Sequence, residues 1–379
     1  MKTIPQIRAI FFMTGALLLT ASCALAAGLP APVAASNTAT AAMRKGLDWL
    51  AAQQKPNGAW SNDDFPAITA LALEAFLRGK HPMKTSIVAR ATAYLRTCVQ
   101  PDGGIYRKVP GKGGGLSNYN TAICMAALHA TGDPAWGPVV LKARRFVAAS
   151  QRGGGDLNAG GMGYDAGGGR AYVDLSNSWI AYEAMRRTQS AEDLRLAGEA
   201  RVDLDWSAAQ RFLSHCQNDA KGGRDEEGGF FYRPDESKAA TTTNAAGKVV
   251  LRAYGSMTYA GLLSLIYSEV KRDDPRARSA FDWAARHWSL DENPGMGQQG
   301  YYYFTQLLAK CLDAYGAEAI PTSAGPVAWR AALSSKLAAL QKNDPAGGYW
   351  VNDNARFWEN DPMLVTAYTL IALETAGEK

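Results

Sequence analysis

The feature that most constrains the fold of this chain is a two-armed unit near its start, which recurs along the sequence. The first arm, residues 43–54, has apolar residues at i, i+3 and i+4, the spacing of a helix with one apolar stripe. A Pro-Asn-Gly stretch at 56–58 ends this arm. The second arm begins at Pro66 and is apolar on nearly every side, which is typical of a buried helix. The unit therefore predicts an outer helix packed on an inner helix.

About six such hairpins follow one another, and this recurrence is the strongest signal in the sequence. Amphipathic arms carry an aromatic–aliphatic pair that is followed by a glutamine, at Gln54, Gln100, Gln151 and Gln217. The Gly-rich turns that come next end in an aromatic residue and read Gly58-Ala59-Trp60, Gly104-Ile105-Tyr106, Gly163-Tyr164, Gly229-Phe230 and Gly348-Tyr349-Trp350. A degraded copy has 281–283 in its outer arm and 301–304 at the start of its inner arm. Stacked hairpins cover one another's apolar faces, so the repeat predicts one continuous core.

The N-terminus has the layout of a secretory signal. Lys2 and Arg8 precede an apolar run that ends at Ala21, and Ala24-Leu25-Ala26 supplies an A-x-A cleavage site. We therefore expect a signal peptide over 1–26, a flexible leader over 27–41 and a single domain over 42–379, in a protein exported to the periplasm or outside the cell. Residues 20–23 also loosely resemble a lipoprotein box, so membrane association through a lipid anchor at Cys23 is an alternative.

Charge and cysteine content name no partner. The net charge falls from +5 to +3 when Lys2 and Arg8 are removed, which is too small over this length to indicate a nucleic acid or an anionic membrane surface. The remaining cysteines form no CxxC pair and are Cys98, Cys124, Cys216 and Cys311. We expect buried free thiols because a core of this size needs no disulfide, although a pair could form in an oxidising compartment.

The Gln…Gly-x-aromatic turns resemble the QW repeats of terpene cyclases. The resemblance covers nearly all of residues 42–379 and is to the α/α-toroid superfamily, which includes squalene-hopene cyclases, other triterpene cyclases and the β subunits of protein prenyltransferases. It implies an all-α (α/α)6 toroid, in which six outer and six inner helices close into a barrel whose cavity takes an isoprenoid. We also expect a short β-hairpin in the 218–254 insertion, with 230–232 paired to 249–251.

Cyclases of this superfamily protonate their substrate from an Asp-x-Asp-Asp motif at the mouth of an inner helix, with the middle Asp as the acid. The matching stretch here is Asp174-Leu175-Ser176-Asn177, which keeps only the first Asp. A serine hydroxyl cannot protonate an alkene, so the resemblance does not carry the usual mechanism to this chain. A helix N-terminal cap explains Asp174 and Ser176 without any chemistry.

The zinc site of the prenyltransferase β subunits does not carry over either. Those subunits use an Asp-x-Cys pair before an inner helix and a later His, whereas the matching stretch here reads Gln298-Gln299-Gly300-Tyr301, and no His follows His287. Without converging thiolate, imidazole and carboxylate ligands, we expect no metal and no cofactor. The residues leave open whether the chain is an enzyme.

The candidate site is a set of polar and aromatic residues predicted at the mouths of the inner helices. Its catalytic candidates are Asp174, Ser176 and Asp361. Its ligand-binding candidates are Tyr119, Asn120, Asn177, Trp179, Ser256, Tyr259, Tyr301, Tyr302 and Trp358. Helix capping and core packing are the plain alternative for each of these residues.

Three functions fit this set. The first is binding of an apolar isoprenoid-like ligand against aromatic walls, or noncanonical chemistry on it. The second is a secreted carbohydrate-active α/α-barrel enzyme, because Trp60, Trp350 and Trp358 lie near carboxylates in the sequence and sugar hydrolysis needs a pair of carboxylates. The third is a non-enzymatic toroid that binds a protein through the long loops 152–172 and 218–254; its protein partner is not named by the sequence.

Overall fold

The computed structural model describes residues 32–109, 115–166 and 172–377, which contain two concentric sets of helices. The expected signal peptide over 1–26 and Cys23 lie outside the described residues. No helix in the described ranges is long and apolar enough to cross a membrane.

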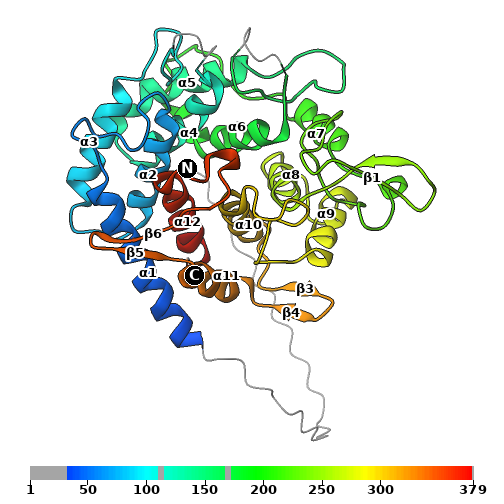
Figure 1. Cartoon of the computed structure of the whole chain (residues 1–379). Helices are drawn as coiled ribbons and strands as arrows, with labels where there is room; N and C mark the ends of the chain where they lie inside the picture. The colour runs from blue at the N-terminus through cyan, green and yellow to red at the C-terminus, as the bar shows by residue number, and fades with distance from the viewer. Residues whose placement is uncertain (1–31, 110–114, 167–171, 378–379) are drawn as a thin grey trace, which may run out of the picture. The chain divides into compact units, whose positions relative to one another are not determined.

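Six inner helices are formed by the apolar arms of the repeat. They are α2 (Pro66–Arg78), α4 (Ser117–Ala130), α6 (Leu175–Arg187), α8 (Gly255–Tyr267), α10 (Tyr301–Tyr315) and α12 (Pro362–Gly377). Each packs on the next in chain order, and α12 packs on α2, which closes the ring (Figure 1). In α12 every residue from Leu364 to Ala376 is buried, as expected of a helix that is apolar on all sides and enclosed by neighbours.

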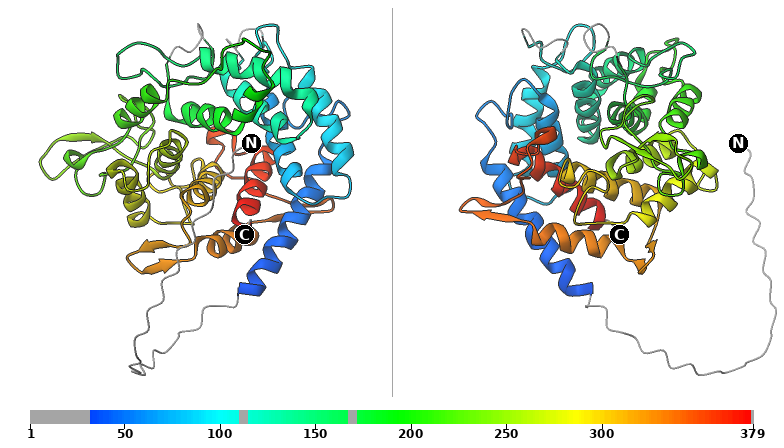
Figure 2. Two further views of the ribbon diagram at one scale, coloured as in Figure 1. Left: turned by 180° about the vertical axis from the view of Figure 1, so that it is seen from behind. Right: turned by 45° about the vertical axis from the view of Figure 1, so that its right-hand side comes forward.

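Six outer helices surround this ring (Figure 2). They are α1 (Pro32–Ala52), α3 (Lys84–Arg96), α5 (Gly137–Ala149), α7 (Trp206–His215), α9 (Pro275–Arg286) and α11 (Trp329–Ala339). Each is amphipathic and buries one face on inner helices; in α7 the buried residues are Ala208, Ala209, Phe212 and Leu213. The predicted all-α (α/α)6 toroid is therefore confirmed.

Helix α1 begins earlier than the sequence analysis predicted. It starts at Pro32 and so runs through most of the stretch 27–41 that was expected to be a flexible leader. Ala39 and Ala42 are buried, and the Ala42 carbonyl accepts a hydrogen bond from the Gln341 side chain at 2.8 Å. Alanine has the highest helix propensity, and these tertiary contacts extend the helix beyond the apolar stripe that marked its arm.

In five of the six hairpins, a turn glycine lets the turn pack closely against the backbone of the next outer helix. Gly160 has φ of 97°, and a Cβ built on it would lie 2.1 Å from the carbonyl oxygen of Ala208 in α7. Gly58 has φ of 90°, and its Cβ would lie 2.2 Å from the Arg90 carbonyl oxygen in α3. The same approach to the following outer helix, or from the last hairpin to the first, occurs at Gly103, Gly228 and Gly347. Only glycine tolerates both the positive φ and the contact.

The repeated glutamines carry hydrogen bonds from one hairpin to the next. The Gln54 side chain donates to Ile87 O in α3 at 3.1 Å, and that of Gln217 donates to Arg276 O in α9 at 2.8 Å. Gln151 bonds the Asp205 carbonyl oxygen in the same way. Gln100 differs, because its amide bonds carbonyls of its own turn. The Gln341 bond to α1 described above joins the last hairpin to the first.

The described residues also contain three short β-hairpins and four 3-10 helices in the connections between the helices of the barrel. The hairpins are β1 (Thr241–Thr243) with β2 (Val249–Leu251), β3 (Ile320–Thr322) with β4 (Gly325–Val327), and β5 (Lys342–Asp344) with β6 (Gly347–Tyr349). The 3-10 helices are η1 (Pro134–Trp136), η2 (Gln189–Leu194), η3 (Ala220–Gly222) and η4 (Arg356–Trp358).

The hairpin predicted in the 218–254 insertion exists, but its first strand was assigned wrongly. Residues 249–251 pair with Thr241–Thr243 and not with 230–232. Residues 230–232 are buried, and their backbone groups bond elsewhere: Phe230 N to Thr258 Oγ1, Phe231 N to Cys216 O, and Tyr232 O to Leu175 N. This aromatic stretch is therefore part of the barrel end, and the polar threonines form the exposed strand.

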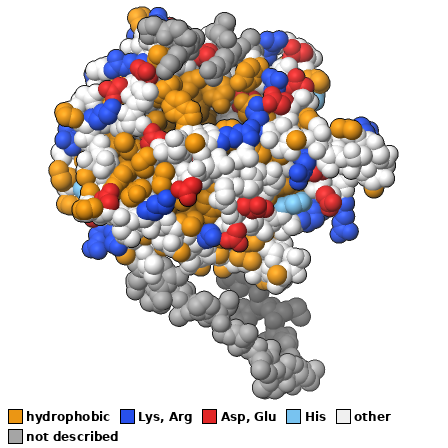
Figure 3. Space-filling model, in the orientation of Figure 1, with side chains coloured by type: hydrophobic (Ala, Val, Ile, Leu, Met, Phe, Trp, Pro, Cys, Tyr) orange, Lys and Arg blue, Asp and Glu red, His pale blue; other side chains and the backbone are white. Residues whose placement is uncertain are grey.

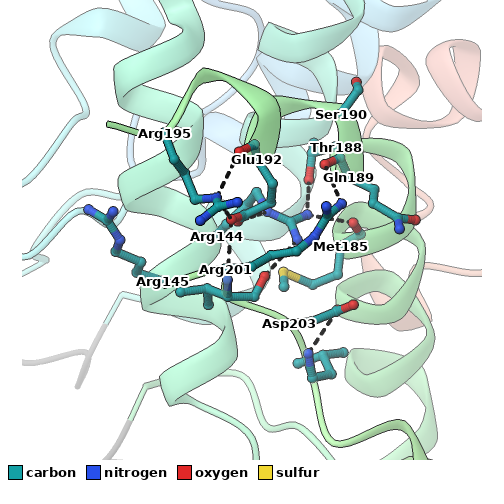
Figure 4. Close-up of polar contacts among 12 residues, drawn as sticks. Arg144, Arg145, Met185, Thr188, Gln189, Ser190, Glu192, Arg195, Arg201 and Asp203 are labelled. Carbon is teal, nitrogen blue, oxygen red and sulfur yellow. Dashed lines mark hydrogen bonds and ion pairs between the residues drawn. The ribbon is translucent and has the colours of Figure 1, made fainter. Parts of the chain in front are cut away.

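A buried arginine holds the long connection after α6 (Figure 4). Arg144 of α5 is fully buried, and its guanidinium contacts the Glu192 carboxylate at 2.7 Å. It also donates to Met185 O at 2.6 Å, Thr188 Oγ1 at 2.9 Å and Val202 O at 2.9 Å. Because all these acceptors lie in α6 or the segment after it, one side chain fixes the path of that segment.

The four cysteines in the described residues, Cys98, Cys124, Cys216 and Cys311, are free and buried, which confirms the expectation of free thiols. Burial raises the thiol pKa of Cys124, Cys216 and Cys311.

Candidate functional site

A cavity of about 330 Å3 lies at the N-terminal ends of the inner helices. Aromatic side chains dominate its lining: Phe65, Tyr119, Tyr164, Tyr232, Tyr254, Tyr303, Phe357, Trp358 and Tyr368. The other lining residues are Ala67, Ile68, Leu71, Leu116, Ser176, Lys238, Ser256, Met257, Asn293, Gly300 and Leu364. Figure 3 shows the molecule in the orientation of Figure 1, with hydrophobic side chains gathered in the upper middle of the face that is seen. The lining contains one charged side chain, Lys238, and otherwise suits an apolar ligand.

Three tyrosines from different inner helices form the deep end of the cavity. They are Tyr119 of α4, Tyr303 of α10 and Tyr368 of α12. The Tyr303 hydroxyl accepts a hydrogen bond from Trp179 Nε1 at 2.6 Å and shares another with the Ser176 hydroxyl at 2.8 Å. Burial raises the pKa of all three phenols, so they stay neutral. We call this set the tyrosine constriction.

A second, smaller hollow lies beyond the tyrosine constriction. This inner chamber has a volume of about 30 Å3 and shares Leu71, Tyr119, Tyr303 and Tyr368 with the cavity. Its remaining lining residues are Glu74, Ala122, Ile123, Ala126, Trp179, Ile180, Glu183, Ala184, Arg187, Gln306 and Lys310. The axis of the barrel thus passes from an apolar cavity through tyrosines to a floor of charged residues.

The rim of the cavity holds two exposed aromatic residues on a strained backbone. Phe357 and Trp358 have φ of 61° and 66°, and their exposed fractions are 46% and 50%. A left-handed conformation costs a residue with a Cβ roughly 1–2 kcal/mol. Trp358 packs edge-on against Phe65 across the rim, with ring centroids 4.7 Å apart. Strain that presents aromatic faces at a cavity mouth is typical of a ligand-contacting loop.

Lys238 is the charged residue among the lining residues of the cavity. Its ammonium lies 4.4 Å from the centre of the Tyr232 ring and forms an ion pair with Glu236. The cation is therefore stabilised by an aromatic face and a carboxylate before any ligand enters.

Asp174 is buried behind the cavity wall. Its carboxylate caps α6, accepting hydrogen bonds from the Asn177 backbone N and side-chain Nδ2, both at 2.8 Å. Burial raises the pKa of Asp174 to about 6, although the bonds from Asn177 and Tyr232 act in the opposite direction. Ser176, at the place of the acid in the cyclase motif, lines the cavity instead. The chain thus presents a hydroxyl where those enzymes have a carboxylic acid.

The structure brings five of the predicted residues to the hollows. Tyr119, Ser176, Ser256 and Trp358 line the cavity, and Trp179 lines the inner chamber.

The other predicted residues are not among the lining residues of the cavity or the inner chamber. Asp361 caps α12, accepting from Met363 N at 2.9 Å, and Asn120 Oδ1 accepts from Ala67 N in the first turn of α2 at 3.0 Å. Tyr259 packs against Phe304 in the core, and the Tyr301 hydroxyl donates to Leu290 O. Tyr302 is buried against Tyr301, while Asp174 and Asn177 form the cap of α6. The N-terminal ends of the inner helices thus contain residues that line the cavity and other residues that cap the helices.

Several lining residues were not predicted from the sequence. Tyr164, Tyr232, Tyr254 and Lys238 lie in connections, and Tyr368 lies in the interior of α12. The aromatic residues that end the turns at Tyr164 and Phe230–Tyr232 were a usable signal, because each such turn leads into the mouth of an inner helix.

Two of the three tryptophans proposed for sugar stacking are not available for it, whereas Trp358 is exposed at the cavity rim. Trp60 and Trp350 are fully buried, and their indole nitrogens bond the carbonyls of Leu50 and Leu337 at 2.7 Å. Glu359 is buried as well and accepts from Tyr303 N at 2.7 Å. No carboxylate is among the described lining residues of the cavity. In the described ranges, no three His, Cys, Asp or Glu side chains group as a metal site would require.

Comparison with solved structures shows that this fold is an α/α toroid, as the sequence resemblance implied, and that terpene cyclases and mannanases share it. The type II terpene cyclase MstE from Scytonema, solved in complex with its product merosterolic acid A, matches with a TM-score of 0.56 and 12% identity over 91% of this chain and 99% of that one. The same enzyme is also known in complex with its substrate, geranylgeranyl dihydroxybenzoate.

Glycoside hydrolases share the architecture to a similar degree. The GH76 α-mannanase of Bacteroides thetaiotaomicron matches with a TM-score of 0.56 and 12% identity over 91% of this chain and 98% of that one. The GH76A α-1,6-mannanase of Salegentibacter, solved with α-1,6-mannotriose, gives 0.52 and 11% over 90% and 98%. No family model matches the chain, and no curated protein matches it. Identities this low establish the fold and leave the function to be argued from the site.

Proposed function

We propose that this protein binds an apolar, isoprenoid-like ligand in the cavity at the mouth of its α/α toroid. The observation that carries the proposal is the lining of that cavity, in which nine of the twenty residues are aromatic and one is charged. A volume of about 330 Å3 is at the small end of the range of ligand sites, roughly 300–1,000 Å3. Terpene cyclases with the same fold bind ligands of this class, which supports the proposal by analogy.

The favourable free energy of such binding comes from removing apolar surface from water. Each methylene group buried contributes about 0.8 kcal/mol, so a prenyl chain of a few isoprene units is enough for micromolar affinity after the cost of association. The flat faces of the tyrosines add contacts that suit alkenes, and the Tyr303 hydroxyl is hydrogen-bonded within the protein.

The proposal does not include the usual cyclase reaction. Ser176 lines the cavity, whereas Asp174 is buried beneath it with both carboxylate oxygens bonded to Asn177. The described wall therefore offers hydroxyl groups, amide groups and one ammonium group, and none of these kinds of group is a strong enough acid to protonate an alkene. Ligand binding, with any chemistry being noncanonical, is the function that these residues support best.

The test is to identify what the cavity holds. Purified full-length protein is extracted with organic solvent, the extract is analysed by mass spectrometry, and binding of farnesol is measured by tryptophan fluorescence. The variant Ile68→Trp fills the cavity from α2 and should weaken binding at least about tenfold. Leu196→Trp, at a site that is 75% exposed, is the matched control and should bind as the unmodified protein does. An empty extract together with no uptake of farnesol would overturn the proposal.

We also propose that the protein is exported, on the evidence of the N-terminal sequence. Cell fractionation and mass spectrometry of the mature N-terminus test this. A mature chain beginning near Ala27 supports signal-peptide cleavage, and lipid on Cys23 that is lost in Cys23→Ser supports the anchored form. An unprocessed protein found in the cytoplasm would contradict both.

A further inference from the structure

The inner chamber adjoins the apolar cavity and brings charged and amide side chains to a lining that is otherwise apolar. Its volume of about 30 Å3 is enough for a group of the size of a water molecule. Because the cavity and the chamber share the tyrosine constriction, a chain that fills the cavity points its inner end toward the chamber.

An unused hydrogen-bond donor lines this chamber. Gln306, from α10, is 1% exposed, and its side-chain Nε2 has no hydrogen-bond partner among the described residues. Native proteins rarely leave a buried amide donor unmatched, because desolvation without a partner is unfavourable. The position of Gln306 therefore indicates an acceptor that enters the chamber from outside the chain.

The charges around the chamber already satisfy one another. Lys310 Nζ contacts both carboxylate oxygens of Glu183, at 3.0 and 2.9 Å. Arg187 contacts the Glu74 carboxylate at 2.9 Å. A charged group that entered here would find no free counter-charge and would lose its hydration, which is strongly unfavourable. The acceptor that fits is neutral.

We propose that the inner chamber binds the oxygen-bearing end of the ligand, a hydroxyl or carbonyl group that accepts a hydrogen bond from Gln306 Nε2. This inference rests on the proposed function and narrows it. The ligand class becomes a prenyl alcohol, aldehyde or ketone that enters oxygen first, with its apolar tail left in the cavity. A pure hydrocarbon leaves the donor unmatched, and a carboxylate or diphosphate brings a charge that the chamber does not neutralise.

The experiment compares probes that differ only at one end. Equilibrium binding to the full-length protein is measured for farnesol, farnesal, farnesene and farnesoic acid at neutral pH. We expect the alcohol and the aldehyde to bind about tenfold more tightly than the hydrocarbon, the ratio given by one buried hydrogen bond, and the acid to bind least.

Two variants assign that preference to the chamber. Gln306→Met keeps the length of the side chain and removes the donor, so farnesol should lose its advantage of about tenfold while farnesene binds as before. Ala126→Val narrows the chamber from α4 and should have the same selective effect, which keeps the test decisive if Gln306→Met fails to fold. Gln210→Met, on the outer helix α7, is the matched control and should leave both affinities unchanged.

The outcomes separate this inference from the proposed function. If no probe binds, the proposed function fails. If alcohol and hydrocarbon bind equally, or if Gln306→Met lowers both affinities alike, the cavity binds apolar ligands but the chamber holds an ordered water only, and this inference is overturned.

Discussion

At the scale of single residues, the turn glycines and the nearby glutamines form contacts between neighbouring hairpins of the ring. Gly160 approaches the backbone of α7 more closely than any side chain would allow, and Gln151 bonds the residue that caps the same helix. The repeated sequence signal is therefore a record of contacts between neighbouring hairpins.

The variant Gly160→Ala should lower the free energy of unfolding by more than about 2 kcal/mol, because a Cβ there combines a left-handed backbone with a clash against the Ala208 carbonyl. Gly154→Ala is the control: its φ is 102°, but nothing lies within 4 Å of an added Cβ. Chemical denaturation of both variants measures the difference. Equal losses would mean that backbone strain alone matters and that the close approach does not.

Asp174 makes a pH-dependent contribution. Its pKa is raised by burial from 3.8 to about 6, so between these values the folded state holds a proton that the unfolded state has released. Stability therefore falls as pH rises through this window, by about 3 kcal/mol from this group. Glu74 acts in the opposite direction: burial alone would raise its pKa, but Arg187, Lys310 and Arg78 outweigh it and lower the pKa.

The contribution of Asp174 is isolated by comparing the protein with Asp174→Asn, whose amide oxygen can still accept from Asn177 N. The difference in unfolding free energy between the two should change by about 2 kcal/mol from pH 4 to pH 7, with the unmodified protein relatively more stable at the acid end. A difference that does not vary with pH would show that the carboxyl keeps its ordinary pKa.

At the scale of elements, much of the fold could be predicted from the sequence, whereas much of the candidate site could not. The period of the apolar residues and the recurring turns marked every hairpin, because those signals are local. A helix that is apolar on all sides gives no sign of which side faces the axis, so Tyr368 in α12 was missed. Of the residues predicted at helix starts, Asp361 and Asn120 accept hydrogen bonds from backbone amides and do not line the cavity.

Asp361→Ala tests the assignment of that residue as a cap. Loss of the bonds to Met363 N and Leu364 N should lower stability by about 1 kcal/mol and leave farnesol binding within about twofold of the unmodified protein. Thermal denaturation measures the change in stability, and the fluorescence titration measures the affinity for farnesol. A large loss of binding with little loss of stability would place the carboxylate in the site after all.

Arg144 tests how one element is held by another. Arg144→Met removes the buried ion pair with Glu192 and should lower the free energy of unfolding by about 3–5 kcal/mol. Arg145→Met, one residue further along α5, removes an exposed ion pair with Glu199 and should cost less than about 1 kcal/mol. Proteolysis of the connection after α6 should speed up in the first variant only; similar rates in both would argue against the role of the buried ion pair.

At the scale of the whole molecule, closure of the ring couples the first hairpin to the last. Helix α12 packs on both α10 and α2, and α1 packs on α11 and α12. An open stack of repeats loses its last unit without losing the others, whereas a ring has no unit that can be removed without exposing two neighbours.

A chain that ends before Pro362 should therefore lose most of its helical circular dichroism, and not only the share of α12, because α2 and α10 are left with uncovered apolar faces. A chain that begins at Pro32 is the control and should unfold as the full-length protein does. Retention of native-like helicity in the shortened chain would mean that the hairpins are stable without closure.

The contact between the first and last hairpins has one more consequence. Helix α1 packs beside α11 and α12. The barrel should therefore still form when the N- and C-termini are moved to a different connection between its helices. A circularly permuted variant, in which a flexible linker joins the original termini and the new termini lie in the exposed turn between β1 and β2, should fold into the same barrel.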